Sequence, residues 1–159
     1  PTVFGFSIQT VYEAMKEHHP DVVLCIGQAG GRTSITVEQI AINLIDASIA
    51  DNQGNQPTDI PVFADGADGY FSTLPVKSMV KAIRQAGIPA AVSYSAGTFV
   101  CNQLMYGVLY YIHHSFPQTR GGFVHVPYIP QQVTSMNRPA PCMALEDIVK
   151  GLEAAIRVL

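Results

Sequence analysis

The sequence has no tryptophan and few charged residues. Lys, Arg, Asp and Glu make up 13% of its 159 residues, whereas about 25% is usual in globular domains. A surface with so little charge is expected to be partly covered, so we expect a homo-oligomer. The nine basic and twelve acidic residues give a net charge of −3. This charge argues against nucleic acid and anionic membranes as partners, because both bind basic patches.

Long apolar runs and paired cysteines are also absent. No apolar stretch approaches the ~18 residues that a membrane helix needs, and no signal-peptide pattern opens the sequence. The cysteines, Cys25, Cys101 and Cys142, are odd in number and lack CxxC spacing. Neither a disulfide framework nor a metal site is therefore expected. Unpaired cysteines fit the reducing cytoplasm, so we predict a cytoplasmic protein.

Apolar residues make up 48% of the chain, which is enough for the core of one domain spanning residues 1–159. Helical periodicity and turn signals predict helices at Phe4–His19, Pro75–Ala86, Phe99–Ser115 and Ala144–Leu159. Apolar runs predict strands at Asp21–Ile26, Ile40–Ile45, Ala90–Tyr94 and Phe123–Val126. The alternation predicts an α/β fold of three layers, α/β/α, with a twisted, mostly parallel central sheet.

Three smaller expectations concern local structure. Thr36–Gln39 resembles a helix-capping turn, and Pro130–Pro141 is expected to be a loop. In the closing helix, the side chains expected to face inward are Leu145, Ile148, Val149, Leu152 and Ile156. In a parallel sheet, active sites lie beyond the carboxyl ends of the strands. We therefore expect the loops after Ile26, Tyr94 and His125 to meet at one edge.

Cys101 is the first candidate for chemistry. It lies at the start of the helix Phe99–Ser115, directly after a turn of small residues. Free N–H groups and partial positive charge at a helix N-terminus favour a thiolate and can hold an oxyanion. The alternative is a small apolar residue that packs the first turn. His125, at the end of a predicted strand, could act as the base, or it could be a core histidine bonded to backbone.

Two further residues have open interpretations. Glu38 directly precedes the apolar segment Ile40–Ile45, and its spacing alone favours a carboxylate that caps a helix start. The loop Gly27–Gly31 lacks the G-x-G-x-x-G order and no phosphate-binding lysine follows it, so it is a weak dinucleotide motif. As a tight turn it would let backbone approach a small ligand. Gln28 could then offer its amide to a neutral polar group.

Four segments in order resemble one family: Gly27–Arg32, Asp51–Pro57, Ala96–Asn102 and Gly122–Tyr128. The resemblance is to bacterial pyroglutamyl peptidase I, also called pyrrolidone-carboxylate peptidase, and covers essentially the whole chain. It implies a phosphorylase/hydrolase-like fold and a cofactor-free cysteine peptidase that removes N-terminal pyroglutamate from peptides. It also implies a cytoplasmic oligomer, a dimer or tetramer.

The resemblance also assigns roles to residues. Cys101 matches the nucleophile, His125 the general base and Glu38 the third member of the triad. Gln28, Phe99 and Val100 match positions near the pyrrolidone ring.

The chain departs from the family in two places. Relatives begin with a strand and a Gly-Phe…Pro-Phe-Gly-Gly loop ahead of the position of Pro1, so we expect one domain that lacks this strand and loop. Ser48 stands where relatives carry an arginine. These departures leave a second hypothesis, a truncated paralogue that only binds or assembles. A third is a transferase like a nucleoside phosphorylase, which the shortage of basic residues near Gly27–Gly31 disfavours.

Overall fold

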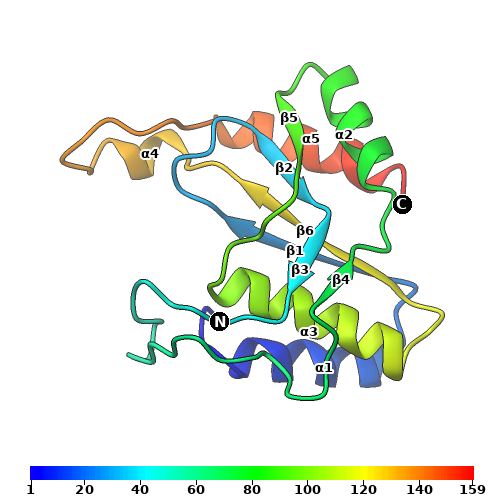
Figure 1. The fold of residues 1–159 in the computed structure, drawn as a ribbon. Coiled ribbons are helices and arrows are strands. Elements are labelled where there is room, and N and C mark those ends of the chain that lie inside the picture. The colour runs from blue at the N-terminus through cyan, green and yellow to red at the C-terminus, as the bar shows by residue number, and fades with distance from the viewer.

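A four-stranded sheet forms the centre of the computed structural model, which describes residues 1–159 (Figure 1). Its strands are β1 (Val22–Gln28), β6 (Arg120–Val126), β2 (Ile35–Glu38) and β5 (Ala90–Ser93), in that spatial order. β1 pairs with β6 and β2 with β5 in parallel, whereas β6 and β2 are antiparallel. Two of the three pairings are thus parallel.

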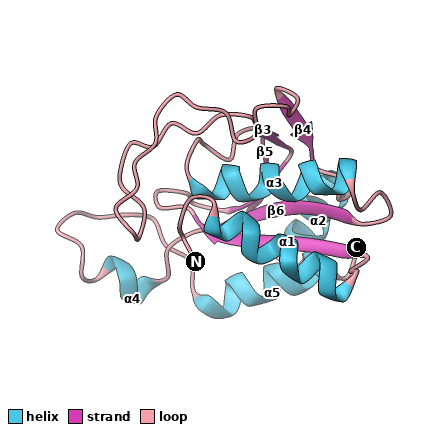
Figure 2. Ribbon diagram, turned by 90° about the horizontal axis from the view of Figure 1, so that it is seen from below, coloured by secondary structure: helices cyan, strands magenta, loops and turns pink.

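Helices cover both faces of this sheet. α1 (Phe6–His18) and α3 (Val100–His114) lie side by side on one face, which Figure 2 shows from below. α2 (Val76–Gln85) and α5 (Leu145–Ile156) cover the other face. One apolar cluster fills each interface, with Phe123 on the α3 side and Val124 on the α5 side. The predicted three-layer α/β fold is therefore confirmed.

The antiparallel pairing of β2 with β6 changes how the loops converge. β5 runs opposite to β1 and β6, so its carboxyl end lies at the other edge of the sheet. β5 therefore does not end beside β1 and β6 as expected, but the loop after Tyr94 still meets the loop after β1, because Arg32 Nη2 donates to Ser95 O at 3.4 Å. Residues 94–99 then lead to the start of α3. The segment after β5 thus contributes Cys101 through the N-terminus of α3.

The segment predicted as a capping turn, Thr36–Gln39, is largely the strand β2. All of Ile35–Glu38 is buried between neighbouring strands, and this burial outweighs the local capping pattern. The predicted strand Ile40–Ile45 shortens to β3 (Ile40–Ile42), which pairs with the unpredicted β4 (Gly69–Phe71) in a separate two-stranded sheet.

The inward face of the closing helix α5 agrees with the prediction only in part. Ile148 is buried and Leu152 is partly buried against the same cluster, as predicted, but Leu145, Val149 and Ile156 are exposed. The buried positions beside Ile148 are Gly151 and Ala155. A β-carbon at Gly151 would lie 2.5 Å from Cδ1 of Ile35, so α5 approaches β2 closely along a side of small residues.

The segment predicted as a loop, Pro130–Pro141, contains the short helix α4 (Pro130–Val133). In Figure 1 it projects beyond the carboxyl ends of β1 and β6. The structure has no helix with the length and apolar character to cross a membrane.

Candidate active site

Cys101 and His125 are both neighbours of Gly27. The parallel register of β1 and β6 pairs Gly27 with His125, and neighbouring strands lie about 4.8 Å apart. Cys101 comes from the first turn of α3, and its Sγ lies 3.1 Å from the position that a β-carbon at Gly27 would occupy. The thiol therefore rests over Gly27, beside the strand that carries His125.

Glu38 lies next to His125. The antiparallel register pairs Thr36 of β2 with His125 of β6, so Glu38 and His125 project from the same face of the sheet. His125 Nδ1 is 2.8 Å from Glu38 Oε1, and both side chains are buried. An ionised carboxylate only accepts hydrogen bonds, so Nδ1–H of His125 donates to it and Nε2 remains free to take a proton. The sequence interpretation of Glu38 as a local helix cap is therefore wrong.

The start of α3 is held by backbone and side-chain contacts. Gly97 has φ of 79°, and the turn it makes is tied to the neighbouring loop by Thr98 Oγ1, which donates to Asp46 O at 2.8 Å. Asn102 donates to the carbonyls of Ile42 and Leu44 and accepts from the Ile42 N–H. Asn102 is a positioning residue that sequence reasoning missed, because its partners are some 60 residues away along the chain.

The N–H groups of the first turn of α3 face the site without a side-chain cap. Phe99 occupies the N-cap position and makes no capping hydrogen bond. The first N–H groups of a helix have no partner within the helix. These donors, close to the Cys101 thiol, form a candidate oxyanion hole.

Burial dominates the electrostatics of the Cys101 thiol. Burial raises the pKa of the Cys101 thiol above its ordinary value, and the Glu38 charge raises the pKa further, while Arg32 lowers it. Burial therefore outweighs the preference for a thiolate that the sequence suggested from the helix N-terminus. The thiol needs a base to remove its proton, and His125, the register partner of Gly27, is the candidate. Burial raises the pKa of Cys25 to about 12, so this neighbouring cysteine stays a thiol.

A cavity of about 470 Å³ opens beside Cys101. All the residues expected near the ring, Gln28, Phe99 and Val100, line it. The other lining residues are Pro1, Thr2, Ile26, Gly27, Cys101, Leu104 and Phe123, and no charged side chain is among them. Gln28 Nε2 donates to Gln132 Oε1 at 2.5 Å, which links this wall to α4. The cavity suits a small neutral ligand.

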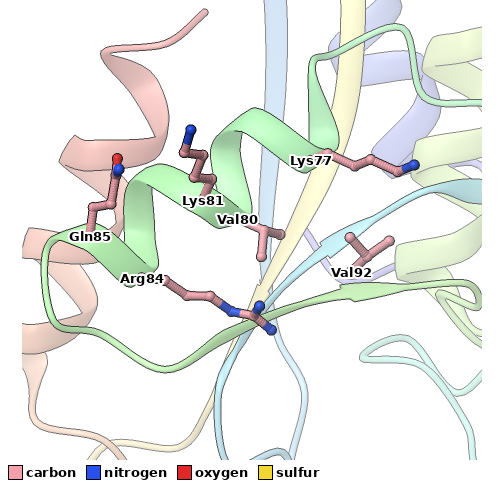
Figure 3. Close-up of a pocket in the computed structure, with 6 residues that line it drawn as sticks. All are labelled: Lys77, Val80, Lys81, Arg84, Gln85 and Val92. Carbon is pink, nitrogen blue, oxygen red and sulfur yellow. The ribbon is translucent and has the colours of Figure 1, made fainter.

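Two other features lie outside this centre. Ser48 is exposed, in the loop that follows Ala47. A larger cavity of about 520 Å³ lies between α2 and β5 and is lined by Lys77, Val80, Lys81, Arg84, Gln85 and Val92 (Figure 3). Its lining contains no cysteine, serine, histidine or carboxylate. No group of three or more His, Cys, Asp or Glu residues is arranged to hold a metal ion.

Comparisons with known proteins cover the whole chain. The model of the family described as pyroglutamyl peptidase matches residues 1–159. The pyrrolidone-carboxylate peptidase of Clostridium botulinum is 55% identical over 157 residues, which is 99% of this chain and 73% of that protein. That of Thermoanaerobacter sp. is 53% identical, over 100% of this chain and 78% of its own length.

Solved structures agree with these sequence matches. The pyroglutamyl peptidase I of Bacillus amyloliquefaciens superposes with a TM-score of 0.96 at 49% identity and covers 99% of this chain and 76% of that one. A mutant pyrrolidone carboxyl peptidase from Pyrococcus furiosus gives a TM-score of 0.95 at 37% identity, with 99% and 77% covered. These findings support a peptidase and give no support to the binding module or to the transferase.

Proposed function

The chain belongs to the pyroglutamyl peptidase family, and from that premise we propose that Cys101, His125 and Glu38 are the catalytic triad with which it removes pyroglutamate from the amino terminus of peptides. One observation carries the assignment. The thiol over Gly27, the imidazole beside Gly27 and the carboxylate bonded to that imidazole come from α3, β6 and β2 and meet in one place.

The first half of the reaction forms a thioester. His125 Nε2 takes the proton from Cys101, and Sγ attacks the carbonyl carbon that joins pyroglutamate to the next residue. Uncapped N–H groups at the start of α3 stabilise the negative oxygen of the tetrahedral intermediate. The protonated His125 then gives its proton to the leaving amine, and the shortened peptide departs. Glu38 holds the imidazole in the required tautomer and stabilises its positive charge.

The second half restores the enzyme. Water attacks the thioester carbonyl while His125 Nε2 accepts a proton from it. The intermediate collapses, the carbon–sulfur bond breaks, and pyroglutamate leaves with a free carboxyl group. The proton on His125 returns to the sulfur of Cys101.

The neutral cavity accounts for the substrate. Pyroglutamate has a lactam in place of a charged α-amine, so its pocket needs no carboxylate. Phe99 and Val100 supply apolar contact, and Gln28 supplies a polar group at the wall of the cavity. We assign these residues to the binding of the pyrrolidone ring.

Three wider features belong to the same proposal. Residues 1–159 act as one domain, since both apolar clusters pack on one sheet. The protein is a homo-oligomer, a dimer or tetramer, which is consistent with exposed apolar side chains such as Phe71 and Tyr94, at 66% and 70% exposure. Its free cysteines suit the reducing cytoplasm.

The experiment is release of a fluorescent amine from a pyroglutamyl amide. Turnover by the chain, abolished in Cys101→Ala and retained in Cys142→Ala, is the expected result. Cys142 is the matched control because it is exposed and lies outside the cavity. Turnover that survives Cys101→Ala contradicts the nucleophile, and a folded chain without turnover contradicts the function.

A further inference from the structure

Arg32 and His125 bind the same oxygen of Glu38. Arg32 Nη1 lies 2.9 Å from Glu38 Oε1, and His125 Nδ1 lies 2.8 Å from that atom. The other oxygen, Oε2, is buried and has no protein partner. The orientation of the carboxylate therefore depends on the two nitrogen groups that converge on Oε1.

Arg32 is the only permanent positive charge in contact with this carboxylate. The Glu38 side chain is 0% exposed, and a buried carboxylate is costly unless it is paired. His125 supplies a hydrogen bond to the carboxylate, whereas the guanidinium of Arg32, whose side chain is 24% exposed, supplies a positive charge that is always present.

The guanidinium of Arg32 is itself fixed at several points. Its Nη1 also donates to Thr36 Oγ1, and its Nη2 donates to Ser95 O at 3.4 Å. Thr36 is the register partner of His125, while Ser95 belongs to the connection that leads to Cys101 and α3. A planar guanidinium can make these contacts at once, whereas an ammonium group cannot reproduce their geometry. Arg32 thus joins the loop after β1 to the segments that carry the triad.

The charge of Arg32 also acts on the nucleophile. Burial and the Glu38 charge both raise the pKa of the Cys101 thiol, and the charge of Arg32 is what lowers it. Sequence reasoning sought such a cation at Ser48. The structure has one at Arg32, which precedes Glu38 in the chain, whereas Ser48 follows Glu38 in an exposed loop.

We propose that Arg32 is a positioning residue of the triad: it orients the Glu38 carboxylate so that Oε1 receives Nδ1–H of His125, and it offsets the Glu38 charge at the Cys101 thiol. The inference rests on the proposed function, since it assigns Arg32 a part in the same reaction. A purely structural role, in which Arg32 only secures the loop after β1, is the alternative to be tested.

The kinetic test is a double-mutant cycle with Arg32→Gln, Glu38→Gln and both together. Arg32→Gln is expected to lower kcat about 10–100-fold, the range found when a group that orients a functional side chain is lost, with KM little changed. Arg32→Lys keeps the charge without the planar group and is expected to retain more of kcat than Arg32→Gln. On the Glu38→Gln background, Arg32→Gln is expected to have little further effect, because the two residues act as a unit.

Arg120→Gln is the matched control. Arg120 is an exposed arginine at the amino end of β6 that donates to Leu159 O, away from the triad. The proposal is overturned if Arg32→Gln lowers kcat by the same factor with and without Glu38, or if it raises KM and leaves kcat unchanged. Thermal unfolding of every variant identifies loss of fold. If Arg32→Gln does not fold, the same cycle is run with Arg32→Lys.

A second readout does not require turnover. Alkylation of Cys101 by iodoacetamide is followed against pH, with peptide mass spectrometry separating Cys101 from Cys25 and Cys142. The charged and titratable groups around Cys101 are Glu38, Arg32, His125 and Cys25. Arg32→Gln is expected to move the alkylation midpoint to higher pH and Arg120→Gln to leave it unchanged. If the alkylation midpoint of Arg32→Gln equals that of the wild type, the proposal for Arg32 is overturned. This test does not depend on turnover, so a wild-type chain that releases no amine contradicts the proposed function and leaves the test of Arg32 intact.

Discussion

The Sγ atom of Cys101 lies 3.1 Å from the place where a β-carbon would stand at Gly27. A real β-carbon at Gly27 would also lie 2.7 Å from the ring of Phe123, so Gly27 has no room for a side chain. Because Gly27 pairs with His125 in the sheet, the missing side chain is what lets the thiol approach the imidazole. Gly27 of β1 is thus a packing requirement for the approach of Cys101 to this part of the sheet.

Gly27→Ala tests this relationship. The added methyl group should push Cys101 away from His125, and a displacement of about 1 Å costs on the order of 10²-fold in rate. We expect kcat/KM for a pyroglutamyl amide to fall by about that factor while the protein stays folded. Gly31→Ala is an informative comparison: its β-carbon would meet nothing within 4 Å, so any loss reflects the φ of 87° alone. Equal activity in Gly27→Ala and wild type would contradict the packing requirement.

Asn102→Ala tests whether the hydrogen bonds that anchor the start of α3 also matter for turnover. Removing the amide leaves the Ile42 N–H and the carbonyls of Ile42 and Leu44 without their partner. Each unpaired buried group costs about 1–3 kcal/mol, so we expect a lower free energy of unfolding in urea together with a lower kcat.

Gln103→Ala is the control for Asn102. Gln103 is a neighbouring buried amide on α3 that accepts from the Gly5 N–H and does not contact β3. It should lose stability but keep kcat. If both variants lose kcat equally, the contact with β3 has no special part in placing Cys101.

Asp51 should make stability depend on pH in the acid range. Burial opposes ionisation of its carboxyl group, but hydrogen bonds from the Asn55 side chain and from the N–H groups of Phe4, Asn55 and Gln53 outweigh burial and lower the pKa from 3.8 to about 2. Because the pKa of Asp51 is lower in the folded than in the unfolded state, its ionised carboxylate stabilises the fold at pH values above 3.8. This stabilisation is lost as the pH falls toward 2.

Unfolding midpoints measured between pH 2 and 5 check this effect. Asp51→Asn, which cannot ionise, should flatten the fall in stability across that window. Asp59→Asn is the control, because Asp59 is an exposed carboxylate in a neighbouring loop. An equally steep fall in Asp51→Asn and wild type would show that other groups carry the acid sensitivity.

Gly151→Val tests the close approach of α5 to the sheet. The first added carbon would already lie 2.5 Å from Cδ1 of Ile35, in a fully buried site. Overpacking of this kind costs about 1–3 kcal/mol, which thermal unfolding would record as a lower midpoint. Glu153→Val, exposed on the same helix, controls for the helix propensity of valine. A Gly151→Val midpoint no lower than that of Glu153→Val would show that α5 has room to shift.

Much of this protein could be read from local sequence. Helical periodicity and proline and glycine signals placed α1, α2, α3 and α5 within a few residues of their ends. A small-residue turn before a helix pointed to Cys101, and a polar residue at a strand end pointed to His125. These features depend on residues within a few positions of one another, so short windows of sequence contain the information.

The tertiary structure decided how these pieces act together. The antiparallel pairing of β2 with β6, which no local pattern encodes, moved Glu38 from a presumed capping turn to His125. Arg32 pairs with Glu38 because β2 places that buried carboxylate within reach of the guanidinium. Burial reversed the expected direction of the Cys101 pKa. The sequence by itself determined the four long helices, the strands β1, β5 and β6 and the candidate groups Cys101 and His125. Distances, burial and charge pairing depend on neighbours far apart in the chain, so only the folded structure determined them, together with the strand β2 and the place of Glu38.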